Sequence, residues 1–255
     1  MQLHQPRLAE MVASILRDRI LSGELQDGDA LPRQEDLLEE FHVSKPSLRE
    51  ALRILEAEGL IAVRRGNRGG AIVHIPKAEN AAYTIALVLQ FRHVPLSDLS
   101  DGLQQIEPIC AVLCAEREDR HSAVLPELHQ IHEQVAAAVD DEVEFTRLSR
   151  RFHEQLVASC GNETLILVVG ALETVWSQHE QDWAARATAA GEFPDRQRRR
   201  SGIRAHERLL EQIDQGDARG TAKVAQRHLD ESQRFALSEA ANATPISIRA
   251  SRNSY

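Results

Sequence analysis

Hydrophobic residues recur every three or four positions through most of this 255-residue chain, and this spacing confines most of it to amphipathic helices. Only 4% of the residues are aromatic, whereas alanine and leucine abound, which favours helices packed on helices over a β-sandwich. A chain of this length with 42% hydrophobic residues can build two compact domains. We therefore expect a mainly α protein with two domains.

The chain lacks the signals of an exported or membrane protein. It has no run of about 18 uncharged apolar residues, and Met1 to Arg7 contain no apolar signal core. Its three cysteines, Cys110, Cys114 and Cys160, are too few for a disulfide framework and are expected as small buried side chains. We expect a cytoplasmic, nucleoid-associated protein with no membrane contact.

The net charge of −9 excludes a generally basic coat for nucleic acid, so any DNA contact requires a local basic patch. One such patch lies between His42 and Ile75, a segment that contains six basic residues and three glutamates. The basic residues are Lys45, Arg49, Arg53, Arg64, Arg65 and Arg68. This segment is therefore the candidate for DNA binding.

The first 75 residues predict three short helices. A helix near residues 8–20 is expected to bury Leu8, Met11, Val12, Ile15, Leu16 and Ile20 on one face. A short second helix ends near His42, and a third begins at Ser44, an N-cap residue followed by Pro46 in the first turn. At the start of this third helix, Ser44, Lys45, Ser47 and Arg49 share the face opposite the apolar stripe.

This pattern suits a DNA groove, because a helix N-terminus offers N–H groups to phosphate while lysine and arginine reach the acceptors of guanine. Residues 60–63 and 71–75 flank a basic, glycine-rich segment and predict a β-hairpin whose tip suits a minor groove. Periodicity alone leaves a second interpretation open, in which a small core merely carries solvated arginines on its surface.

Leu31-Pro32 and the segment VSKPSLREALRILEAEGLIAVRRGNRGGAIV, from Val43 to Val73, resemble the GntR family of bacterial transcriptional regulators. The resemblance implies a winged helix-turn-helix with a small β-hairpin. It places the DNA contacts at Ser44, Lys45, Ser47 and Arg49 on the recognition helix and at Arg65 and Gly66 on the wing tip.

The chain departs from this family at the start of its second helix. Members usually have an acidic residue followed by a DNA-contacting arginine there, whereas this chain has Gln34 and Glu35. Arg33 is the expected substitute for the missing arginine, and the preferred operator changes accordingly.

Beyond residue 76 the long helical periods predict an all-α bundle. Seven helices are expected near residues 80–91, 98–117, 123–139, 142–159, 162–181, 201–215 and 218–240. Residues 187–200, which contain three consecutive arginines, are expected to form a loop with the arginines in solvent. The predicted domains are residues 1–76 for DNA binding, 77–243 for effector binding and dimerisation, and 244–255 as a flexible tail.

Within the predicted bundle, His153, His206 and His228 fall on inward faces of three helices. Three neutral imidazoles can form one face of a divalent-metal site with positions left open for a small ligand. Spacing alone favours ordinary partly buried or surface histidines, because the chain has 11 histidines.

Several short motifs around these histidines resemble the FCD-type ligand-binding domain of the FadR subfamily of GntR regulators. They are Phe152-His153, Gly161-Asn162, Ala205-His206-Glu207, Gly216-Asp217 and His228-Leu229. The subfamily places an aspartate one turn before the first histidine and an arginine three residues before a glutamate. This chain has Ser149 and Gln104 at those positions, and Glu107 is that glutamate.

The resemblance leaves two alternatives for the site. A divalent metal such as zinc binds His153, His206 and His228, or the pocket takes an effector directly through Gln104, Ser149 and the three histidines.

The hypothesis is a repressor that binds an inverted-repeat operator as a homodimer and responds to a small-molecule effector, an organic acid or a lipid-derived compound. It is not expected to be an enzyme, because the His-Glu-x-x-His, Gly-x-x-x-x-Gly-Lys and Gly-x-Ser-x-Gly motifs are absent. The alternatives are a DNA-binding adaptor whose helical domain only dimerises and a metal-dependent enzyme.

Overall fold

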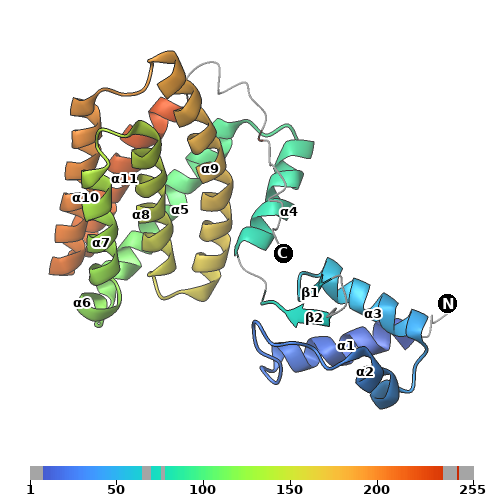
Figure 1. Cartoon of the computed structure of the whole chain (residues 1–255). Helices are drawn as coiled ribbons and strands as arrows, with labels where there is room; N and C mark the ends of the chain where they lie inside the picture. The colour runs from blue at the N-terminus through green and yellow to red at the C-terminus, as the bar shows by residue number, and fades with distance from the viewer. Residues whose placement is uncertain (1–7, 65–69, 76–77, 238–245, 247–255) are drawn as a thin grey trace, which may run out of the picture. The chain divides into compact units, whose positions relative to one another are not determined.

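The computed structural model describes residues 8–64, 70–75, 78–237 and 246, which form two compact units. The predicted wing-tip residues Arg65 and Gly66 lie outside the described residues, as does the predicted tail apart from Ile246. The first unit contains α1 (Leu8–Leu21), α2 (Gln34–Phe41), α3 (Lys45–Ala57), β1 (Ile61–Arg64) and β2 (Gly70–Val73) (Figure 1).

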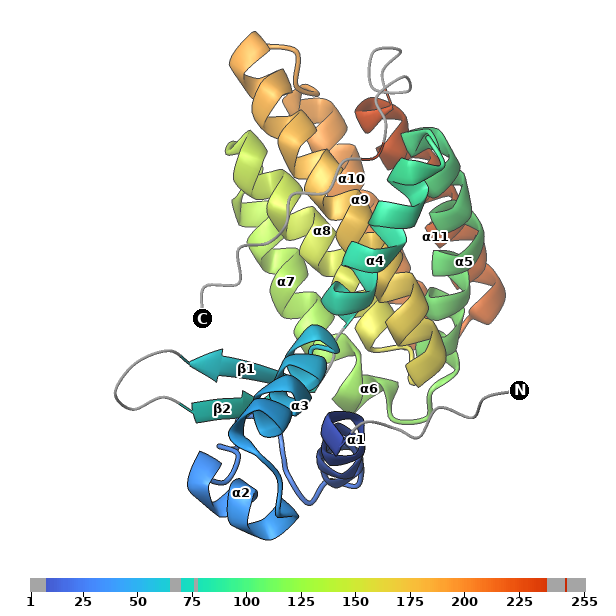
Figure 2. The same cartoon turned by 90° about the vertical axis from the view of Figure 1, so that its right-hand side faces the viewer.

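The first unit is built as the sequence predicts, with α1 packed on α3 and an antiparallel hairpin in which Ile61 pairs with Val73. Leu16, Leu48 and Leu55 are buried in its core. The strands β1 and β2 lie side by side in Figure 2. A mainly α fold with a helix-turn-helix and a small hairpin is confirmed.

The segment between α1 and α2 also joins this sheet, which the sequence did not indicate. Ala30 forms a bridge with Ile72, and the Leu31 N–H donates to the Ala71 carbonyl at 2.8 Å. The backbone of residues 29–31 therefore extends the hairpin by a short third segment.

The predicted buried face of α1 was partly wrong. Leu8, Met11 and Ile15 are 58%, 49% and 43% exposed, whereas Ala9 and Ala13 are buried. In so small a domain the core covers only one narrow stripe of the helix, so apolar residues beside that stripe stay in solvent.

The second unit is all-α in its described residues, and six of its helices form a ring in which each packs on the next. Its helices are α4 (Ala78–Phe91), α5 (Leu96–Glu116), α6 (Arg120–Ala123), α7 (Leu125–Ala137), α8 (Glu142–Ala158), α9 (Glu163–Ala190), α10 (Arg196–Gln215) and α11 (Ala218–Ala236). The ring runs α5, α11, α10, α7, α8, α9, and α4 packs against α9 (Figures 1 and 2). Helices α8, α9, α10 and α11 line the cavity described below.

The predicted loop over residues 187–200 was wrong. Helix α9 continues to Ala190 and α10 begins at Arg196, so the connection is only residues 191–195. Gly191 ends α9 in the left-handed conformation, and the Asp195 side chain caps α10 by accepting from the Arg198 N–H. The expectation of solvated arginines also fails for Arg199, which is buried.

The short helix α6 was not predicted. The three cysteines are free and buried, as expected from their apolar neighbours. None of the described helices is long and apolar enough to cross a membrane.

Candidate functional site

In the first unit, four of the predicted DNA contacts lie together at the start of α3. The Ser44 side chain caps the helix by accepting from the Ser47 N–H, and the two hydroxyl oxygens are 3.0 Å apart. Lys45 and Arg49 are exposed and have no ion pair within the described residues. Arg33 is exposed at the N-cap of α2. The basic groups at the start of α3 are therefore available to an anionic partner.

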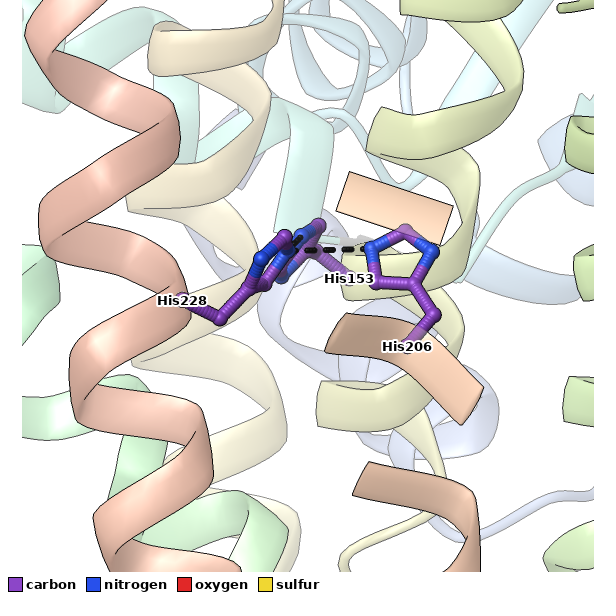
Figure 3. A group of neighbouring side chains, drawn as sticks. All are labelled: His153, His206 and His228. Atoms are coloured by element: carbon purple, nitrogen blue, oxygen red, sulfur yellow. Dashed lines mark hydrogen bonds between the residues drawn. The ribbon is translucent and has the colours of Figure 1, made fainter. Parts of the chain in front are cut away.

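In the second unit, His153 of α8, His206 of α10 and His228 of α11 point toward one another (Figure 3). The Nε2 atom of His228 lies 3.1 Å from Nε2 of His153 and 3.0 Å from Nε2 of His206. All three side chains are buried, and one nitrogen of each lies within 4.8 Å of the others. The structure thus brings together the three histidines that the sequence selected.

The three rings are neutral in this environment. Burial, aided by the positive charge of Arg150, lowers the pKa of His153 to about 3. Burial also lowers the pKa values of His206 and His228 well below their ordinary value. Neutral imidazole is the form that binds a metal ion.

The nitrogen atoms of the cluster are better arranged to bind a cation than to hydrogen-bond to one another. Nδ1 of His153 lies 2.5 Å from Oε1 of Glu107. In the tautomer with its hydrogen on Nδ1, His153 donates to Glu107 and keeps a lone pair on Nε2. The single hydrogen of His228 then cannot form good bonds to both neighbouring Nε2 atoms. A divalent ion held by the three Nε2 atoms satisfies all three lone pairs, and the donor set therefore fits such a metal.

A buried ionic network stands behind His153. Glu107 of α5, Arg150 of α8 and Glu173 of α9 are at most 2% exposed. Arg150 forms ion pairs with Glu173 at 3.4 Å and with Glu180 at 2.8 Å. Burial, followed by the negative charge of Glu107, raises the pKa of Glu173 well above its usual value.

This network fixes the first histidine. Burial raises the pKa of Glu107, while neighbouring Glu173 and Arg150 oppose that rise. A carboxylate on the outer nitrogen of a metal-binding histidine sets its tautomer and orientation. Glu107 can hold His153 in this way.

The histidines line a cavity of about 340 Å³ that also contains Ser149. Ser149 Oγ has no hydrogen-bond partner in the described part of the chain, although it is buried. Four arginines and two glutamates line the cavity: Arg150, Arg198, Arg199, Arg234, Glu180 and Glu231. Three of these arginines form ion pairs with acids, Arg150 with Glu173 and Glu180, Arg199 with Glu142, and Arg234 with Asp230. The guanidinium groups bring N–H donors to the cavity wall, and such donors favour an anionic ligand.

Gln104, the other predicted effector residue, lies on α5 outside the lining of this cavity. Its amide donates to Gln233 Oε1 at 3.0 Å and lies 3.4 Å from Ser100 Oγ. The structure therefore places Ser149 beside the histidines, whereas Gln104 contacts Ser100 and Gln233 instead.

Sequence reasoning missed other residues of the site. His132 of α7 lies beside His206, with ring centroids 6.2 Å apart. Trp183 and Phe193 line the cavity, and no motif marked them. The position of Glu107 three residues after Gln104 marked it in the sequence, but nothing in the sequence predicted its contact with His153.

Comparison with known proteins identifies the protein family of the two units. A model of the FCD domain matches residues 98–231, more than half of the chain, and a model described as bacterial regulatory proteins, gntR family, matches residues 8–70. The chain belongs to the GntR family. This GntR-family protein is a DNA-binding transcriptional regulator with an FCD ligand-binding domain, and its family consists of regulators, not enzymes.

The similar curated proteins are also regulators. The HTH-type transcriptional regulator Mce2R of Mycobacterium tuberculosis is 28% identical over 83% of this chain and 84% of its own length. The Exu regulon transcriptional regulator of Escherichia coli K12 is 28% identical over 72% and 68%. The HTH-type transcriptional repressor NanR of Salmonella newport is 27% identical over 89% and 85%.

Among solved structures, Streptococcus agalactiae GntR matches this GntR-family chain with a TM-score of 0.66 and 20% identity. The match covers 89% of this chain and 99% of that chain. This similarity confirms the fold.

Proposed function

We propose that this regulator binds an inverted-repeat operator as a homodimer, represses transcription there, and releases or retains DNA according to an anionic effector in the second unit. The observation that carries the proposal is the convergence of His153, His206 and His228 in a cavity that four arginines also line. Repression is supported by the similar protein NanR, which is named a transcriptional repressor.

A divalent metal such as zinc fits the proposed effector site. His153, His206 and His228 would hold the ion through Nε2, and Ser149 lies one turn before His153 on the same helix. When bound, such an ion supplies open positions for an oxygen of an organic acid. Ser149 is a weaker ligand than a carboxylate, so the three histidines provide most of the affinity.

The DNA-binding half of the proposal is tested with full-length protein and a pool of random duplexes. Selection should yield an inverted repeat bound by two chains, which footprinting and mass measurement of the complex can establish. Arg49→Ala should weaken binding to the selected duplex roughly 5- to 150-fold, the effect of losing one good base contact.

The control is Arg227→Ala, which removes an equal charge from the exposed face of α11 in the second unit. It should leave the affinity for the duplex unchanged. Undiminished binding by Arg49→Ala would remove α3 from the proposed interface.

The ligand-binding half is tested by metal analysis of the purified protein. We expect about one zinc ion per chain after incubation with zinc and dialysis, and loss of that ion in His206→Asn. His129→Asn is the matched control, because His129 is an exposed histidine of α7. A protein that binds no metal and no organic acid would instead be the DNA-binding adaptor considered above.

A further inference from the structure

The cavity beside the histidines has an aromatic wall, although the chain is poor in aromatic residues. The whole chain has two tryptophans, two tyrosines and six phenylalanines, and three of these ten residues line this cavity. Phe145, Trp183 and Phe193 are all half-buried. The rings of Trp183 and Phe193 lie 5.3 Å apart between centroids and are tilted by 35°. Ring surface is thus left open to a ligand within the cavity.

The aromatic wall and the histidines lie toward opposite ends of the cavity. Phe145 precedes His153 by eight residues on α8, which corresponds to about 12 Å along the helix axis. On α10, the lining residue Arg198 precedes His206 by the same number of residues, and Phe193 comes before the start of that helix. A ligand that reaches both ends must therefore be elongated.

The polar end has few groups other than histidine to hold an acid. Arg150 is engaged with Glu173 and Glu180, and Arg199 with Glu142. By contrast, Ser149 and the three histidines line the cavity, and Ser149 Oγ has no hydrogen-bond partner among the described residues. The carboxylate of a ligand is accordingly best held at this end, with its apolar part toward Trp183 and Phe193.

We propose that the effector is an aryl-substituted carboxylic acid, whose acid group lies at the histidines and whose planar ring packs on Trp183 and Phe193. This assignment rests on the proposed function of the same cavity as an anionic-effector site. A flat ring fits because it gains stacking contacts beyond the burial of apolar area, which a saturated ring of similar size lacks. The cavity volume of about 340 Å³ lies within the range of small-molecule sites.

Three acids with the same spacer test the proposal by calorimetric titration of the zinc-treated full-length protein. They are 4-phenylbutyrate, 4-cyclohexylbutyrate and butyrate. We expect 4-phenylbutyrate to bind about tenfold more tightly than butyrate and several-fold more tightly than the cyclohexyl compound.

Variants locate that preference. Trp183→Leu and Phe193→Leu should each reduce the advantage of the phenyl compound while leaving the affinity for butyrate within about twofold of the original. Phe91→Leu is the matched control, because Phe91 lies on α4, is 86% exposed and is not part of this cavity. It should keep the full preference.

The possible failures are distinct. Equal affinity for all three acids would overturn the aromatic assignment and leave the anionic-effector function intact. A phenyl preference that survives both Trp183→Leu and Phe193→Leu would place the ring elsewhere and also overturn the assignment. If none of the acids bound, the organic-acid effector of the proposed function would fail together with this inference.

Discussion

At the scale of single residues, Glu107 is not one of the three histidine ligands, but it positions the first of them. It lies 2.5 Å from Nδ1 of His153, with both groups buried. Glu107→Gln removes the charge that favours the Nδ1–H tautomer, so we expect zinc affinity to fall about 10- to 100-fold. Competition with a fluorescent zinc chelator measures this change.

The control for Glu107→Gln is Glu154→Gln. Glu154 adjoins His153 in sequence but is exposed and bonds to the Ser177 hydroxyl. Zinc affinity should not change in this variant, and unchanged affinity in Glu107→Gln would contradict the positioning role.

Ser149 provides the opposite test, in which a ligand is added. Its Oγ has no hydrogen-bond partner among the described residues and lines the cavity. Ser149→Asp brings a carboxylate to the site, and we expect zinc to bind roughly tenfold more tightly or better. Ser232→Asp, at another cavity-lining serine, controls for added negative charge. Equal gains in both variants would show that charge, not coordination, is responsible.

The residues also show what the sequence can and cannot reveal about a site. Helical spacing placed the three histidines on inward faces, and the resemblance to the FCD-type domain then selected them as a candidate site. Glu107 meets His153 across two helices and 46 positions of sequence, and periodicity does not specify which inward faces meet. For the same reason Gln104, only three residues before Glu107, turned out to face Gln233.

At the scale of elements, the connection between α9 and α10 shows where composition misleads. Gly191, Pro194 and the run of arginines made residues 187–200 resemble a loop, yet arginine is a good helix former. The cap residues Gly191 and Asp195 were the better guide, because they mark the two helix ends found in the structure. The strongly periodic segments, by contrast, were assigned correctly as helices.

Arg199 holds that connection in place. Its guanidinium donates to the carbonyls of Val139 and Pro194 at 2.7 and 2.6 Å and to Glu142 at 3.0 Å. Arg199→Ala leaves these acceptors without their buried partner, so the free energy of unfolding should fall by about 2–3 kcal/mol. Urea unfolding measures the loss.

Arg200→Ala is the comparison for this substitution, since Arg200 is the next residue of α10 and is exposed. Its unfolding free energy should stay within about 0.5 kcal/mol of the original. A similar loss in both variants would mean that the effect comes from helix composition and not from the contacts of Arg199.

At the scale of the whole molecule, the buried histidines make the metal-free protein sensitive to acid. His153 has its pKa lowered from 6.5 to about 3 in the folded state, because burial and then Arg150 disfavour the charged ring. Below pH 6.5 the unfolded chain binds a proton that the folded chain does not. The free energy of unfolding therefore keeps its full value above pH 6.5. As the pH drops from 6.5 toward 3, it falls by about 1.4 kcal/mol per pH unit for each such histidine.

Urea unfolding of chelator-treated protein at pH 7, 6 and 5 checks this dependence. Replacing His153 with glutamine, which does not titrate, should make the decline shallower, whereas the same change at exposed His129 should not. An equal slope in all three proteins would contradict the assignment of the acid sensitivity to His153.

Coupling between the two units gives a prediction that no single residue can test. If zinc in the histidine cluster changes operator affinity, thermodynamic linkage requires that operator DNA change zinc affinity by the same factor. We expect a factor of about 5–150, the usual range for coupled sites. Zinc titrations with and without the selected duplex, and duplex titrations with and without zinc, measure it from both directions. His206→Asn should abolish both effects. A zinc effect on DNA binding that survives in this variant would mean that zinc acts on the DNA or at another site, and the histidine cluster would not be the sensor.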